Sequence, residues 1–69
     1  MSQLGDEVLD RLTGEWQTVA EIAAQIEKHP RKAEITHKEM IRTHLESLVA
    51  YGIAGRTEER PVRYRRAKP

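Results

Sequence analysis

The sequence predicts a small α+β domain in which three helices are followed by a two-stranded β-hairpin. Apolar residues recur at helical spacing through most of the first fifty positions, and two Thr-x-x-Glu patterns mark expected helix starts. After Gly52 the spacing changes to the alternation of extended strands. The chain has 69 residues, which is the size of one domain. We therefore expect a single domain that spans residues 1–69.

The first two helices are marked by their apolar spacing and by the residues at their ends. The first is expected over about residues 4–12, and a short strand is expected over about 16–18. Thr18 and Glu21 then form a capping box, in which each residue can satisfy the other's backbone amide. The second helix should follow over about 19–28.

The third helix carries the clearest signals and is expected over about residues 37–51. Thr36 and Glu39 form a second capping box before it. Gly52 stands where a left-handed residue would end it. The spacing of this helix predicts a buried stripe made of Ile41, Leu45 and Leu48.

The remaining residues predict a hairpin over about 53–66 with a turn at 58–61. Alternation predicts that its two faces differ, one packed and one basic. We expect the packed face to hold Val62 and Tyr64 and the opposite face to hold Arg56, Arg63 and Arg65. The three aromatic residues are too few for a single-strand stacking platform. Trp16 is expected in the core, and Tyr51 and Tyr64 are expected either in the core or against the base of the hairpin.

Composition excludes several classes of protein. There is no cysteine, so disulfide frameworks and thiolate zinc sites are excluded. The apolar runs are too short for a membrane span, and the acidic N-terminus lacks a signal-peptide core, so a cytoplasmic protein is expected. We predict no metal site, because the three histidines, His29, His37 and His44, lack carboxylate or thiolate partners at ligand spacing, and the last two lie on the apolar side of the third helix. We predict no catalytic residues and no cofactor, because the chain has only two serines, no cysteine, no supported pair of carboxylates and no phosphate-binding glycine loop.

Charge is distributed unevenly along the chain although the net charge is only +1. Residues 1–30 contain six acidic and two basic side chains, whereas residues 53–69 contain two acidic and six basic ones. Such asymmetry is typical of nucleic-acid binding when the basic part folds onto one face, and a solvated basic tail is the alternative.

The chain resembles the winged helix-turn-helix DNA-binding domains from about Leu4 to Arg66. The stretch Gly14–Ala23 looks like the family's first strand leading into its second helix. Thr43–Ile53 is similar to the HLxxLxxxGLV signature at the end of the recognition helix, and Arg60–Arg65 looks like the returning strand of a wing. The resemblance implies three helices plus a C-terminal two-stranded β-wing.

The resemblance also implies which residues contact DNA. The N-terminal half of the third helix would enter the major groove, where Arg42 suits bidentate pairing with guanine and Glu39 either remains in the cap or accepts from cytosine N4. The recognition-helix candidates are Thr36, His37, Lys38, Glu39, Arg42 and Thr43. The wing would lie along the backbone or in the minor groove, and its candidates are Arg56, Arg60, Arg63, Arg65 and Arg66.

The expected function is sequence-preferring binding of double-stranded DNA by a small transcription regulator. Besides DNA, the expected partner is either a second copy of the chain, as a homodimer on DNA, or a larger protein. The alternative is a winged-helix module that docks on a protein of a transcription or replication complex without reading DNA. The acidic first third and the mixed charges of the third helix favour that alternative.

Overall fold

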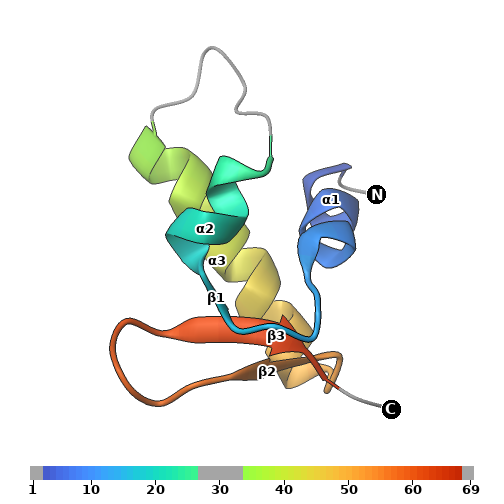
Figure 1. Cartoon of the computed structure of the whole chain (residues 1–69). Helices are drawn as coiled ribbons and strands as arrows, with labels where there is room; N and C mark the ends of the chain where they lie inside the picture. The colour runs from blue at the N-terminus through green and yellow to red at the C-terminus, as the bar shows by residue number, and fades with distance from the viewer. Residues whose placement is uncertain (1–2, 27–33, 68–69) are drawn as a thin grey trace.

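The computed structural model describes residues 3–26 and 34–67, and these form three helices on one side of a small antiparallel sheet (Figure 1). In chain order the elements are α1 Gln3–Arg11, β1 Gln17–Thr18, α2 Val19–Ala24, α3 Glu34–Ala50, β2 Ala54–Arg56 and β3 Arg63–Arg66. The predicted α+β class with three helices is confirmed. None of the described helices is long and apolar enough to cross a membrane.

The sheet has three strands in the order β1-β3-β2, so the expectation of two strands is wrong. The short segment before α2 pairs with β3, which places Gln17 opposite Tyr64. On the other side of β3, Arg56 also lies opposite Tyr64, and Gly55 lies opposite Arg65. The last strand of the chain is therefore the middle strand of the sheet, and it joins the hairpin to the segment that starts α2.

One hydrophobic core joins all three helices to the sheet. Its members are buried aliphatic side chains together with one tyrosine: Val8, Leu12, Val19, Ile22, Ala23, Ile26, Ile41, Leu45, Ala54 and Tyr64. The stripe predicted on α3 is confirmed for Ile41 and Leu45, which are fully buried, whereas Leu48 is partly buried at the edge of this cluster.

Two of the predicted helix-end signals are confirmed. The Thr18 hydroxyl accepts from the Glu21 amide at 3.1 Å, and the Glu21 carboxylate accepts from the Thr18 amide at 2.8 Å. Gly52 has φ of 78°, and α3 ends in the Schellman arrangement, in which Gly52 donates to Val49 and Ile53 donates to Leu48.

The capping box predicted at Thr36 is wrong because the helix already includes Glu34, two residues earlier. A Thr-x-x-Glu spacing also fits the interior of a helix, where Glu39 pairs instead with Arg42, three residues later. The second helix ends at Ala24, earlier than expected, and residues 27–33 lie outside the described residues.

The three aromatic side chains differ in their surroundings. Tyr64 is 2% exposed, which confirms its predicted packing. Tyr51 follows the last turn of α3 and is 79% exposed, and Trp16 is 39% exposed, so neither is a core residue. Trp16 lies on the outer face of the sheet, where its indole is next to Gly55 and stacks with the Arg65 guanidinium at 4.3 Å.

Replacing Leu45 with alanine should destabilise the domain by about 2–5 kcal/mol, because a fully buried leucine leaves a cavity in a well-packed core. A single core of this size supplies only roughly 3–5 kcal/mol net, so the variant should be largely unfolded at room temperature. Urea denaturation followed by circular dichroism measures this. Ser47→Ala, at an exposed position of the same helix, is the control, and equal midpoints for the two variants would contradict the assignment of the core.

Candidate nucleic-acid interface

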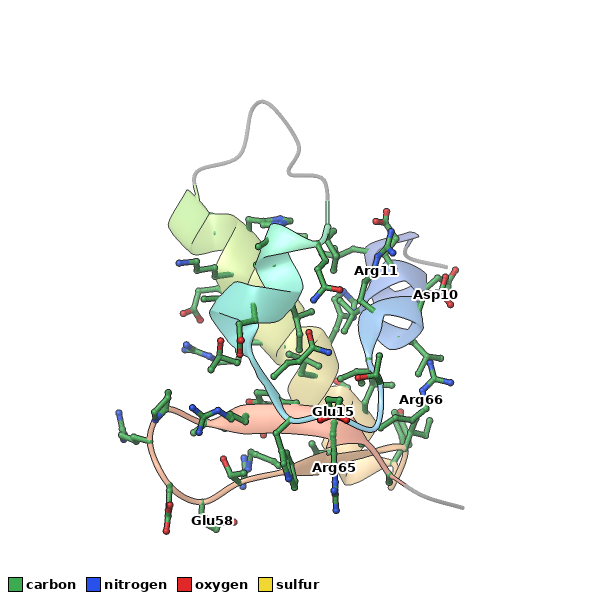
Figure 2. All side chains as sticks on the ribbon, in the orientation of Figure 1. Asp10, Arg11, Glu15, Glu58, Arg65 and Arg66 are labelled. Atoms are coloured by element: carbon green, nitrogen blue, oxygen red, sulfur yellow. The ribbon has the colours of Figure 1, made fainter. Side chains whose placement is uncertain are left out.

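An open groove of about 870 Å³ lies between α3, the start of α2 and the β2–β3 hairpin. In Figure 2 the hairpin extends beyond the helices at its turn, where Glu58 is labelled, and this projection forms one wall of the groove. No described residue of α1 contributes to the lining. The lining residues are Thr18, Val19, Ala20, Lys38, Arg42, Glu46, Arg56, Thr57, Glu58, Arg60, Pro61, Val62 and Tyr64.

The helical wall of the groove is set by the period of α3. Lys38, Arg42 and Glu46 are each four residues apart, so they project from one side of the helix in a row. The neighbouring side of the same helix carries Ile41 and Leu45, which fix α3 in the core. The row is therefore held in a constant orientation toward the hairpin.

Glu46 links this row to the hairpin. One carboxylate oxygen accepts from the Arg56 guanidinium at 2.6 Å, and the other accepts from the Tyr64 hydroxyl. Arg56 and Tyr64 lie opposite each other on β2 and β3, so one carboxylate holds both strands of the hairpin. Arg56 also lies near Glu58 in the hairpin turn, at 3.9 Å.

The same link determines how these groups titrate. The hydrogen bond from Tyr64 lowers the pKa of Glu46, and the hydrogen bond from Arg56 lowers it further, although partial burial opposes both effects. Burial, together with the hydrogen bond to Glu46 and its negative charge, raises the pKa of Tyr64 to about 12. The carboxylate is thus kept charged and the phenol is kept neutral at physiological pH.

Arg42 is held less firmly than Arg56. It pairs with Glu39 at 3.1 Å, but the two side chains are 53% and 60% exposed. Ion pairs between exposed side chains contribute only about 0–1 kcal/mol, because water competes and the side chains lose entropy. A ligand can therefore draw Arg42 away from Glu39 at a small free-energy cost.

The structure brings together four of the predicted site residues, two from α3 and two from the hairpin: Lys38, Arg42, Arg56 and Arg60. The other candidates do not line the groove: Thr36, His37, Glu39, Thr43, Arg63, Arg65 and Arg66. Thr36, Glu39 and Thr43 are exposed on α3 outside the groove. The Thr43 hydroxyl donates to the Glu39 carbonyl at 2.9 Å within the helix.

His37 is wrong as a DNA contact because its side chain is only 6% exposed. It is the buried polar residue in the described part of the chain, and its Nε2 atom has no hydrogen-bond partner. Its position four residues before Ile41 places it on the packed side of α3. The helical spacing that predicts the buried stripe also predicts that His37 lies on the packed side of α3.

The expectation that Arg56 shares a face with Arg63 and Arg65 is wrong. Residues opposite each other in an antiparallel pair point to the same face, so Arg56 shares the face of Tyr64 and turns toward α3. Arg63 and Arg65 flank Tyr64 and point to the outer face, and Figure 2 shows Arg65 directed away from the helices. The sheet thus divides the arginines of the hairpin into two sets.

Arg66 has a structural partner elsewhere. Its guanidinium donates to the carbonyl of Leu9 near the end of α1, and its backbone amide donates to Thr13 at 2.7 Å. A cation at the C-terminal end of a helix also interacts favourably with the helix dipole. We therefore assign Arg66 to the attachment of α1 to the sheet.

The sequence alone does not identify several of the groove residues, above all Glu46 and the start of α2. Helical spacing places Glu46 on the side of the third helix away from the buried stripe, but its partners lie ten and eighteen residues away, beyond any local pattern. The first residues of α2 join the groove because β1 pairs with β3. The i, i+4 relation of Glu46 to Arg42 was the one signal available in the sequence.

The groove combines four basic side chains with two acidic ones, Glu46 and Glu58. Such a lining can bind a polyanion through its guanidinium and ammonium groups while the carboxylates accept hydrogen bonds from amino groups. Comparison of the chain with protein-family models, with curated proteins and with solved structures finds no match. The chemistry of the groove is therefore the basis for a functional proposal.

Tyr64 should titrate near pH 12 in the folded protein, compared with about 10 for an unperturbed tyrosine. Because the folded state holds this proton more tightly, stability should be constant below about pH 10 and should fall as pH rises from about 10 toward 12. Absorbance of the tyrosinate at alkaline pH in a Tyr51→Phe variant isolates this group. A midpoint near 10 while circular dichroism still reports a folded protein would contradict the link to Glu46.

Proposed function

We propose that this chain is a winged-helix domain that binds double-stranded DNA with sequence preference, as a small transcription regulator. In this proposal α3 is the recognition helix and the β2–β3 hairpin is the wing. The observation that carries the proposal is the convergence of Lys38 and Arg42 from α3 with Arg56 and Arg60 from the hairpin on one groove. Residues far apart in the sequence are thereby brought into one groove, whose lining has more basic than acidic side chains.

The geometry of α3 supports insertion into a major groove, which admits one α-helix. Lys38 and Arg42 are one turn apart on the side of α3 that lines the groove, and in this proposal that side faces the base edges. Arg42 suits bidentate pairing with guanine O6 and N7, because its pair with Glu39 is exposed and exchanges at low cost. Lys38 suits a phosphate.

The hairpin supports a second contact along the DNA backbone. Arg60 is exposed at the hairpin turn and lines the groove from the side opposite α3. An arginine in this position can donate two parallel hydrogen bonds to a phosphate. Glu58 and Glu59 at the same turn would repel phosphates, which favours a contact along the groove wall over deep insertion of the tip.

The salt dependence of binding tests this surface. Each phosphate contact adds about 0.9 to the slope of log affinity against log salt concentration, so Lys38→Ala and Arg60→Ala should each lower the slope by about that amount. Arg11→Ala removes the same charge from α1, which does not line the groove, and should leave the slope unchanged. Fluorescence anisotropy with a labelled random-sequence duplex measures all three. Equal slopes for the three variants would remove the groove from the DNA interface.

Arg42→Ala should reduce sequence preference more than it reduces binding. A bidentate contact with a base is worth about 1–3 kcal/mol of discrimination, whereas phosphate contacts are sequence-independent. The measurement compares affinity for a duplex selected by the parent protein from a random pool with affinity for the unselected pool. Equal losses on both would identify Arg42 as a phosphate contact, and no loss would place it outside the interface.

A protein-docking module is the second candidate, and exposed apolar side chains favour it. Trp16, Ile53 and Tyr51 are 39%, 41% and 79% exposed, and none of them lines the groove. Aromatic residues of this kind are enriched at protein interfaces. This candidate predicts that the parent protein shows no salt-dependent affinity for duplex DNA in the anisotropy experiment.

A further inference from the structure

Glu46 is an unusual residue for the middle of a DNA-binding groove, because its carboxylate lies between two cationic side chains that would otherwise attract phosphates. It follows Arg42 by one turn of α3, and it accepts from Arg56 at 2.6 Å. Both basic side chains lie close enough to Glu46 to lower its pKa. Glu46 is also 40% exposed, so it faces the space that a ligand would fill.

The carboxylate occupies the position in which a phosphate would approach Arg56. Its Oε1 atom accepts from the guanidinium and its Oε2 atom accepts from the Tyr64 hydroxyl, so two donors that suit a phosphate oxygen are already engaged. A phosphate that approached Arg56 would have to displace this carboxylate or remain beside its negative charge. Arg56 therefore lines the groove without adding an available positive charge to it.

We propose that Glu46 is a specificity-determining residue of the groove, which neutralises Arg56, weakens binding to DNA backbone in general and favours duplexes that present amino groups to α3. This inference rests on the proposed DNA binding. It restricts the phosphate contacts to Lys38 and Arg60, and it gives Arg56 and Tyr64 the role of positioning residues that hold the carboxylate in place.

The chemistry of the carboxylate indicates which bases it would accept. An ionised carboxylate has about four lone-pair sites, and the two hydrogen bonds of Glu46 leave one site free on each oxygen. In the major groove the hydrogen-bond donors are the amino groups of cytosine N4 and adenine N6, and a glutamate pairs with the former. Beside Arg42, which suits guanine, Glu46 would thus favour a neighbouring cytosine.

Glu46→Gln tests this role because it removes the charge while it keeps the shape of the side chain and an acceptor for Tyr64. Without Glu46, Arg56 keeps only its 3.9 Å contact with the exposed Glu58, which water screens. Arg56 therefore becomes available to phosphates, so the slope of log affinity against log salt for random duplex should steepen by about 0.9. Affinity for random duplex should rise more than affinity for a selected site, so the ratio of the two should fall. Glu7→Gln, the same change on α1 outside the groove, should alter neither quantity.

The double variant Glu46→Gln/Arg56→Ala separates release of Arg56 from simple removal of a negative charge. The inference predicts that its salt slope returns to the parent value, because the released cation is gone. A slope that stays steep in the folded double variant would show that Arg56 makes no difference, and an unchanged slope in Glu46→Gln would show that Glu46 does not restrain phosphate binding. Either result would overturn the inference.

A measurement without DNA distinguishes failure of this inference from failure of the proposed function. In the Tyr51→Phe background, Glu46→Gln should shift the alkaline titration of Tyr64 to lower pH, because the negative charge that opposes ionisation of the phenol is lost. If this shift occurs but the parent protein binds no duplex, the link exists and the proposed function is wrong. If the parent binds duplex but the shift is absent, the role of Glu46 is wrong.

Discussion

The hydrogen bond between Tyr64 and Glu46 joins the two halves of this domain, because it connects the middle strand of the sheet to the long third helix. The ring of Tyr64 is buried in the core, and its hydroxyl donates to the Glu46 carboxylate, which also accepts from Arg56 of the neighbouring strand. The same placement of the hairpin against α3 thus buries the ring of Tyr64 and gives its hydroxyl a hydrogen-bond acceptor. The groove exists because this placement is fixed.

The register of the sheet determines which charges can act together. Because Arg56 lies opposite Tyr64, it turns toward α3 and joins Lys38, Arg42 and Arg60 in the groove. Arg65 is one residue beyond Tyr64, so it points to the outer face and stacks on Trp16. A duplex in the groove would therefore not contact Arg65, and the outer face of the sheet is left with an exposed indole and a neighbouring guanidinium.

The features that sequence analysis predicted correctly depend on neighbours within a few residues. The Thr18–Glu21 capping box, the left-handed Gly52 and the buried side of α3 at Ile41 and Leu45 need no knowledge of tertiary structure. The errors concern long-range pairing. Alternation along one strand could not show that Arg56 lies on the same face as Tyr64, or that Trp16 lies on the opposite face, because both depend on how the three strands pair. Glu46 has partners that lie beside it only when the hairpin has folded.

The most direct test of the central claim is a map of amide chemical-shift changes by nuclear magnetic resonance as random-sequence duplex is added to the labelled protein. If the groove binds DNA, the largest changes should fall at Lys38, Arg42 and Arg60, and the indole signal of Trp16, the only tryptophan, should move little. Changes centred on Trp16 and Arg65 would contradict this account, because they would place the duplex on the outer face of the sheet.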